Sequence, residues 1–237
     1  MKDLIISECF GPTLQGEGPS TGKPAAFVRL GMCNLDCHVC DTPYTWDWAG
    51  KNGVKYAKAI ELTHQTIDGV VAWCAPHQSA GRLIVVTGGE PLVQREALGV
   101  AVLDLVKRGP VEIETNGTLP PLSRLAHPNL AYNVSPKTSA MLEHAADRIV
   151  ASSMEAFTGR IDVRWKFVVA TDGDVAEVQE LVHRFEIPWS KVWLMPEGVT
   201  ADALNARLGW LSDVCVSVGA NLSHRLHVLA WGNTRGR

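Results

Sequence analysis

The chain has 237 residues, of which 46% are hydrophobic and 20% charged, as in an ordinary globular protein. Its formal net charge is −3, and no run of Lys and Arg exceeds two residues, so the clustered cations of a nucleic-acid surface are not predicted. Residues 1–10 are too polar and too short for a signal peptide, and no apolar run approaches a membrane span. We expect a cytoplasmic protein without a nucleic-acid or membrane partner.

Short β-branched apolar runs alternate with amphipathic stretches along the chain, a pattern typical of βαβ units and a parallel sheet. The predicted strands are 26–30, 83–86, 111–114, 130–134, 163–169, 191–195 and 226–231. The predicted helices are 63–75, with Thr63 as a possible cap, 95–107, 175–185 and 201–218.

The helical pieces after Leu119 and around 141–150 are short and poorly periodic, which indicates abbreviated crossovers. No internal repeat or linker divides the chain. The prediction is therefore an α/β fold in a single domain, 1–237: a partial (β/α) TIM-like barrel with about six parallel strands and some abbreviated helices.

Cys33, Cys37 and Cys40 lie within eight residues, in C-N-L-D-C-H-V-C. Three close thiols suit a [4Fe-4S] cluster with one iron open to a ligand, because Cys thiolates normally hold such clusters. A zinc site with His38 or a distant residue as the fourth ligand, or thiols without a metal, are the alternatives. Cys9, Cys74 and Cys215 are isolated in the sequence, and we interpret them as small buried hydrophobes.

Polar motifs follow most of the predicted strands. They are Gly31-Met32-Cys33, Thr87-Gly88-Gly89-Glu90-Pro91, Thr115-Asn116-Gly117, Ser135-Pro136-Lys137 and Pro196-Glu197-Gly198. Because ligands bind at the carboxyl ends of parallel strands, these loops are expected to line one pocket. The paired glycines let the backbone approach a ligand, and Glu90 could accept from a ligand ammonium; a tight strand-to-helix turn is the alternative.

Four further features suggest ligand contacts, and three of them have a structural alternative. Gln15 and Glu17, in the glycine-rich segment 10–19, could address the donor–acceptor edge of a heterocycle, and Arg29 could clamp a carboxylate or point into solvent. Asp41-Thr42 could supply an oxygen ligand to Mg²⁺ or form an Asx turn. Lys137 and Lys166 could hold anionic groups or be solvated.

The cysteine triplet followed by Gly-Gly-Glu-Pro resembles the radical S-adenosylmethionine superfamily. Within it the chain resembles the 7-carboxy-7-deazaguanine synthase family over residues 10–137, with looser agreement at 166–169 and 227–236. The motifs are Thr13-Leu14-Gln15-Gly16-Glu17-Gly18, Arg29, Cys33 to Thr42, Thr87 to Pro91, Glu114-Thr115-Asn116-Gly117 and Val134-Ser135-Pro136-Lys137.

This resemblance implies a radical lyase that converts 6-carboxy-5,6,7,8-tetrahydropterin to 7-carboxy-7-deazaguanine with loss of ammonia, in queuosine and 7-deazapurine biosynthesis. The reduced [4Fe-4S] cluster would cleave S-adenosyl-L-methionine, and the resulting 5′-deoxyadenosyl radical would take hydrogen from the pterin. The cofactor would be regenerated in each turnover. Mg²⁺ would assist the ring contraction, a flavodoxin-like external donor would supply electrons, and the enzyme would be a homodimer.

The resemblance also implies roles for individual residues. Cys33, Cys37 and Cys40 would hold the cluster and Thr42 would bind Mg²⁺. The substrate would contact Leu14, Gln15, Gly16, Glu17, Arg29 and Thr87. The cofactor S-adenosylmethionine would contact Gly89, Glu90, Ser135, Pro136, Lys137 and Lys166, with the rest of 166–169. No acid or base is assigned. Val39 departs from the superfamily, which often has an aromatic residue before the third cysteine.

Two other functions remain open from the sequence. One is a glycyl-radical-enzyme-type activase, which would need an open groove for a loop of its partner protein rather than the small-molecule contacts suggested by Gln15, Glu17 and Arg29. The other is a zinc-stabilised binding module without catalysis.

Overall fold

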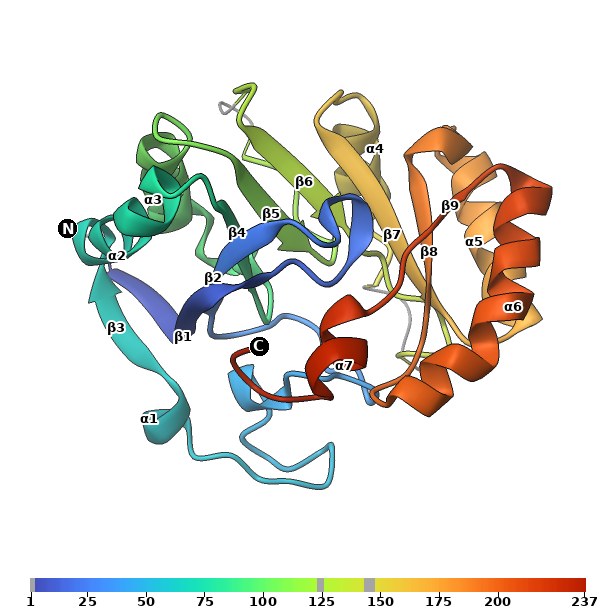
Figure 1. Cartoon of the computed structure of the whole chain (residues 1–237), viewed down its shortest axis with the longest axis horizontal. Helices are drawn as coiled ribbons and strands as arrows, with labels where there is room; N and C mark the ends of the chain where they lie inside the picture. Colours follow the sequence, from blue (N-terminus) through green and yellow to red (C-terminus); the bar gives the residue numbers. More distant parts are fainter. Residues whose placement is uncertain (1–2, 123–125, 143–147) are drawn as a thin grey trace.

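In the computed structural model, which describes residues 3–122, 126–142 and 148–237, nine strands form one sheet (Figure 1). Their order across the sheet is β3-β1-β2-β4-β5-β6-β7-β8-β9. The strands are β1 (Asp3–Leu14), β2 (Pro24–Leu30), β3 (Thr63–Thr66), β4 (Leu83–Gly88), β5 (Val111–Thr115), β6 (Leu130–Val134), β7 (Val163–Val169), β8 (Val192–Pro196) and β9 (Asn221–Leu222).

Six consecutive strands of this sheet, β2 and β4 to β8, pair in parallel and confirm the predicted partial barrel. The short β9 adds in parallel to β8, whereas β1 and β3 add antiparallel at the other edge. β4 shows why apolar runs predicted this arrangement, since its first five residues are all buried, as in a strand covered on both faces.

Seven α-helices connect the strands in the described residues. They are α1 (Lys58–Glu61), α2 (Ile67–Ser79), α3 (Arg95–Leu105), α4 (Ala151–Thr158), α5 (Asp172–Arg184), α6 (Ala201–Val218) and α7 (Leu226–Trp231). Threonine side chains cap α2, α5 and α6: Thr66, Thr171 and Thr200 each accept from a backbone N–H of the first turn. In the described ranges no helix has the length and apolar character needed to span a membrane.

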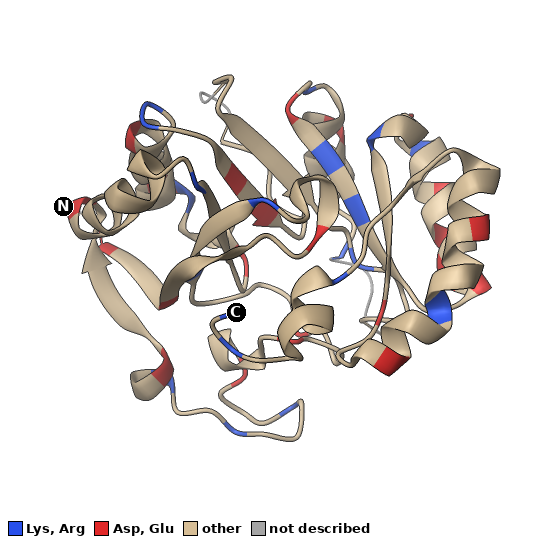
Figure 2. Ribbon diagram, viewed as in Figure 1, with Lys and Arg blue, Asp and Glu red and all other residues tan. Residues whose placement is uncertain are grey.

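The two faces of the sheet differ in character because successive strand residues point to opposite sides. One set, such as Val28, Ile113 and Trp165, joins the large apolar core shared with helices α2 to α6. The alternate set includes Arg29, Glu112, Glu114 and Lys166. Figure 2 shows acidic residues on β5 and basic residues on β7. In Figure 1, α7 and the segment that follows β2 lie across this polar face.

Two predicted elements are wrong. Residues 226–231 form α7, not a strand: the backbone N–H of Leu226 donates to the Gly16 carbonyl, and β9 already occupies the edge beside β8. The predicted helix 63–75 instead begins as β3, which pairs with β1, so that Thr66 rather than Thr63 caps the helix.

The long strand β1 was not predicted, because its charged start and its glycine do not follow a simple apolar alternation. Its register against β2 shifts twice, between Ile6 and Glu8 and between Phe10 and Thr13. The expected short helical piece around 141–150 includes residues 143–147, which lie outside the described residues.

Candidate active site at the carboxyl ends of the strands

A cavity lies where the carboxyl ends of the parallel strands meet, as the sequence predicts. The cysteine loop, the Thr87–Gly89 turn, Glu114–Asn116, Ser135, Lys137 and Met195–Val199 line it. Residues from the two ends of the chain complete the wall: Leu14–Glu17 from the N-terminal part, and Arg225, His227 and Arg237 from the C-terminal part.

The three cysteines of the cluster motif all line this cavity and are partly buried. The Leu35 N–H donates to Cys33 Sγ over 3.4 Å, and the Trp46 indole N–H donates to Cys40 Sγ over 3.3 Å. Burial raises the pKa of Cys33 to about 12 and also raises that of Cys37, so a free thiol there would be neutral. Donors aimed at sulfur and a cavity beside all three thiols fit a cluster whose iron ions stabilise the thiolates.

The arrangement of donors also bears on the zinc alternative. Within the described ranges, no group of three His, Cys, Asp or Glu side chains converges closely enough to hold one metal ion. A zinc ion needs its ligands to converge within about 2.3 Å of a single point, whereas the thiolates of a [4Fe-4S] cluster bind separate irons.

Gly88 and Gly89 bring the end of β4 against the cysteine loop. A Cβ at Gly89 would lie 2.1 Å from the Met32 carbonyl oxygen and 2.9 Å from Cys33 Cβ. Gly88 has φ +147°, and a Cβ there would lie 2.2 Å from the Leu30 carbonyl oxygen. Glycine is required at both positions because the backbone of this turn lies against the backbone of residues 30–32, whether or not a ligand is bound.

Glu90 is fully buried and does not line the cavity. Its carboxylate accepts from the backbone N–H groups of Leu92 and Asn116 and from the Thr115 hydroxyl. Direct contact of Glu90 with a cofactor, as expected from the sequence, is therefore not supported: this carboxylate holds the loops after β4 and β5 together. Pro136 is likewise buried outside the cavity wall, between Ser135 and Lys137, which line it.

Gln15 lines the cavity, but the polar atoms of its side chain form hydrogen bonds within the protein. Its amide nitrogen donates to Glu112 over 2.8 Å and to Glu114 over 3.1 Å, and its oxygen accepts from the Glu17 N–H. The expectation that this side chain addresses a heterocycle is therefore not supported. Gln15 instead orients Glu114, whose other oxygen accepts from the Thr87 hydroxyl over 2.7 Å.

The buried carboxyl of Glu112 is expected to make the stability of the folded protein depend on pH. Burial, and then the neighbouring Glu114, raise the pKa of this carboxyl above its usual value. Because the folded state binds this proton more tightly than the unfolded chain, the stability that it contributes is lost as the pH rises from about 4.3, the pKa of an unfolded Glu.

We therefore expect Glu112→Gln to become more stable than the parent chain as the pH rises from 4 to 8, since Gln cannot acquire the buried charge. Urea unfolding at a series of pH values measures this difference. The same substitution at Glu155, an exposed residue of α4, is the control. A difference between Glu112→Gln and the parent that does not change with pH would contradict the prediction.

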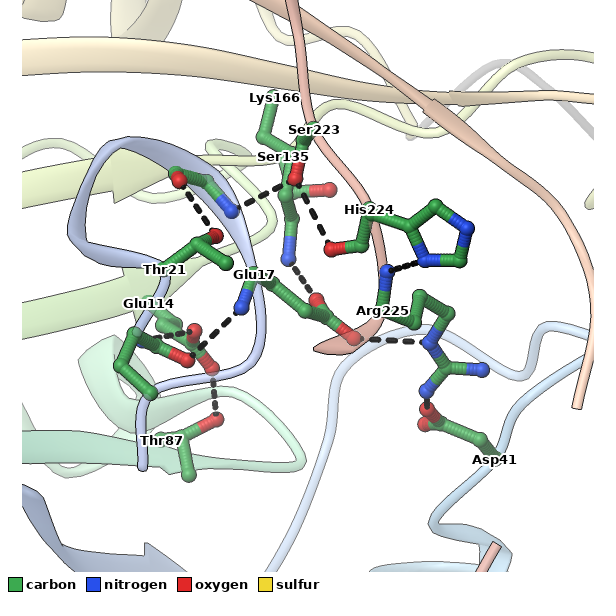
Figure 3. Close-up of polar contacts among 12 residues, drawn as sticks. Glu17, Thr21, Asp41, Thr87, Glu114, Ser135, Lys166, Ser223, His224 and Arg225 are labelled. Atoms are coloured by element: carbon green, nitrogen blue, oxygen red, sulfur yellow. Dashed lines mark hydrogen bonds and ion pairs between the residues drawn. The ribbon is translucent and has the colours of Figure 1, made fainter. Parts of the chain in front are cut away.

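Two carboxylates and two cations form a network at the centre of the cavity wall (Figure 3). Glu17 forms ion pairs with Lys166 and, over 2.9 Å, with Arg225. Arg225 also pairs with Asp41 and donates to the Gly198 carbonyl over 2.8 Å. Burial alone would raise the pKa of Glu17, but Lys166 and Arg225 hold it well below its usual range. Arg225 likewise outweighs burial and lowers the pKa of Asp41.

This network places the C-terminal segment directly against the N-terminal one. A Cβ at Gly16 would lie 1.9 Å from His227 Nδ1, so α7 packs on the backbone of the Gln15–Glu17 turn. Burial lowers the pKa of His227, which leaves a neutral imidazole at the cavity wall near neutral pH.

Arg29 lies in the wall and does not point into solvent; 15% of its side chain is exposed. Its Nε donates to Glu8 over 2.7 Å, and among the described residues its two terminal nitrogens have no protein hydrogen bond. Leu14, Gly16, Thr42, Thr87, Gly89 and Lys166 also line the cavity, and Lys137 donates to Ser135 Oγ over 3.2 Å.

Sequence reasoning missed Arg225 and His227, and gave no separate role to Glu114. Glu114 belongs to the motif Glu114-Thr115-Asn116-Gly117. Its position two residues after Glu112 on one strand indicates that both side chains face the same side of the sheet. Arg225 has no such signal, because it precedes an apolar run, 226–231, whose pattern predicts a strand.

Comparison with known proteins shows which family this chain belongs to. The radical SAM superfamily matches residues 28–197. A 7-carboxy-7-deazaguanine synthase from Pyrobaculum aerophilum is 37% identical over 227 residues, which cover 95% of this chain and 94% of that protein. The chain belongs to the 7-carboxy-7-deazaguanine synthase family of the radical SAM superfamily. The resemblance found in the motifs is thereby confirmed.

Other relatives agree with this assignment. The enzyme of the same name from Rhodopirellula baltica is 32% identical, over 98% of this chain and 88% of that protein. A crystal structure of QueE from Escherichia coli has a TM-score of 0.72, with 26% identity over 95% of each chain. A structure of SuiB from Streptococcus suis bound to S-adenosylmethionine, at 13% identity and a TM-score of 0.53, covers 81% of this chain and 44% of that one and shows the shared fold alone.

Proposed function

We propose that this chain is a radical lyase that converts 6-carboxy-5,6,7,8-tetrahydropterin to 7-carboxy-7-deazaguanine and ammonia. The observation that carries the proposal is the juxtaposition, in one cavity, of the three-cysteine loop with Arg29, Glu17 and Glu114. A guanidinium suits the carboxylate of this pterin, and carboxylates suit the N–H groups along its ring edge. Release of one ammonia balances the reaction without an external oxidant, which is consistent with a cofactor that is regenerated.

The cysteines would hold the [4Fe-4S] cluster, which, together with S-adenosylmethionine, supplies a hydrogen-abstracting radical when bound. Gly89, Ser135, Lys137 and Lys166 would contact the cofactor. Arg29 would bind the substrate carboxylate through its terminal nitrogens, while Glu17 and Glu114 would accept from the ring. The C-terminal segment, which contributes Arg225, His227 and Arg237 to the cavity wall, would help to exclude water from the radical.

Thr42 is our proposed Mg²⁺ ligand. Thr42 lines the cavity, its hydroxyl lies 3.8 Å from Cys40 Sγ, and an oxygen ligand from a loop suits an ion that keeps several waters. A flavodoxin-like electron donor, a homodimer, a cytoplasmic location and a single radical SAM domain over 1–237 are further parts of the proposal, and they rest on the family resemblance and the composition.

The activase alternative would need an open groove for a partner's loop. Here Arg225 and His227 from the C-terminal segment form part of the cavity wall, and Arg225 is bound to Glu17 and to the Gly198 carbonyl, which favours a small molecule.

Anaerobic reconstitution with iron and sulfide, followed by S-adenosylmethionine, a reductant and the carboxytetrahydropterin, tests the proposal. We expect 7-carboxy-7-deazaguanine and ammonia in equal amounts, with little net consumption of the cofactor. Cleavage of the cofactor without conversion of the pterin would overturn the proposed substrate while leaving the family assignment intact.

A further inference from the structure

We infer that Glu8 is a positioning residue that orients Arg29 for the substrate carboxylate. This inference rests on the proposed function, because it assumes that Arg29 binds that carboxylate. Glu8 does not line the cavity and was not singled out in the sequence. It faces Arg29 directly across the β1–β2 pair.

The contact between the two residues determines which edge of the guanidinium remains available. Glu8 Oε1 accepts from Arg29 Nε over 2.7 Å, and 15% of each side chain is exposed. This hydrogen bond occupies the Nε side and leaves the edge formed by the two terminal nitrogens for a ligand. That edge can bind a carboxylate through two parallel hydrogen bonds.

Aromatic rings fix the plane of the same guanidinium. Arg29 Cζ lies 5.6 Å from the centre of the Phe10 ring, and Phe10 stacks on Phe27 with 4.9 Å between centroids. The Phe10 ring restrains the plane of the Arg29 guanidinium, and Glu8 restrains rotation within that plane. The two contacts together define the direction in which the two terminal nitrogens of Arg29 point.

Glu8 is itself held on both oxygens. Oε1 also accepts from the Tyr44 hydroxyl over 2.9 Å, and Oε2 accepts from Arg235 Nε over 3.0 Å. Arg235 in turn donates to Glu61 over 2.8 Å and lies 3.9 Å from the centre of the Tyr44 ring. A carboxylate with three donors has little freedom to turn, as a positioning residue requires.

The direction in which carboxylate affinity changes when Glu8 is replaced distinguishes a positioning role from a purely electrostatic one. Loss of the negative charge at Glu8 would by itself strengthen the binding of an anion to Arg29, because a competing carboxylate is removed. Loss of positioning would weaken it. A decrease in carboxylate affinity can therefore not come from the change in charge.

The test uses the reconstituted protein with S-adenosylmethionine and two probes, pterin-6-carboxylate and the uncharged pterin-6-carboxamide. For Glu8→Ala we expect the preference for the carboxylate to fall about tenfold, the effect of weakening one charge-assisted contact, with carboxamide binding unchanged. Glu8→Gln, which keeps a neutral acceptor for Arg29 Nε, should restore part of the preference. Glu61→Ala is the matched control, because it removes a partner of Arg235 without touching Arg29, and it should keep the parent preference.

An unchanged or increased preference in Glu8→Ala, or equal values for Glu8→Ala and Glu8→Gln, would overturn the inference. If Glu8→Ala fails to fold or to bind iron, Glu8→Asp decides, because it keeps the charge and withdraws the carboxylate from Arg29 Nε by one methylene: a preference equal to or above that of the parent chain overturns the positioning role. Arg29→Met separates the two proposals, since a variant that still prefers the carboxylate would refute the substrate role of Arg29 itself.

Discussion

Replacing Cys37 with alanine is expected to abolish turnover and to lower the iron content of the reconstituted protein. Cys37 lies between the two other thiols of the loop, and all three line the same cavity. Two thiolates are too few to hold a [4Fe-4S] cluster at a defined position, so the remaining iron would be labile. Iron and sulfide analysis, the absorption spectrum and product formation measure the effect.

Cys74→Ala is the matched control for this experiment. Cys74 is fully buried in α2 within the apolar core, away from the cavity. Its loss should cost about 1 kcal/mol of unfolding free energy and leave the iron content unchanged. A Cys37→Ala protein with normal iron and normal turnover would refute the cluster assignment.

Gly89→Ala is expected to eliminate activity through the backbone. The added methyl group would lie 2.1 Å from the Met32 carbonyl oxygen, which already accepts from the Glu90 N–H. Because neither partner is the end of a flexible side chain, the turn and the cysteine loop must separate. We expect a loss of about 3 kcal/mol or more in unfolding free energy, together with a decrease in bound iron.

Chemical denaturation and iron analysis check this result, and Gly99→Ala provides the comparison. Gly99 lies within α3, where the nearest atom to an added Cβ is Leu122 Cδ2 at 3.9 Å. Alanine there should raise stability by about 0.5–1 kcal/mol, because it lowers the entropy of the unfolded chain. A Gly89→Ala protein as stable as Gly99→Ala, with full iron content, would show that the close approach is not required.

The parallel sheet could be predicted because its strands are buried on both faces. A continuous apolar run such as Leu83–Val86 has one simple interpretation when amphipathic stretches flank it. The apolar run at 226–231 is wrongly predicted as a strand, because its length and composition suit either a short strand or a short helix. What decides is the assembled structure, in which β9 takes the position beside β8 and the Leu226 N–H donates to the Gly16 carbonyl.

The candidate site could be predicted where the chain itself places residues after strands, as for the cysteine loop and Thr87–Gly89. It could not be predicted where function depends on partners far along the chain. Gln15 has the right chemistry to address a ligand, yet Glu112 and Glu114 occupy its amide. The pairing of Glu8 with Arg29 depends on the register of β1, which the sequence pattern did not reveal.

The network of Glu17, Asp41, Lys166 and Arg225 has a consequence for how this sequence can change during evolution. The two carboxylates and two cations balance one another, although 208 positions separate Glu17 from Arg225. Losing one member of a buried ion pair, such as Glu17 with Lys166 or Arg225, costs about 3–5 kcal/mol, and the cost is smaller at Asp41, whose side chain is 39% exposed. Single substitutions at these positions should therefore be rare among relatives, and a neutral residue at 225 should be accompanied by neutral residues at 17 or 41.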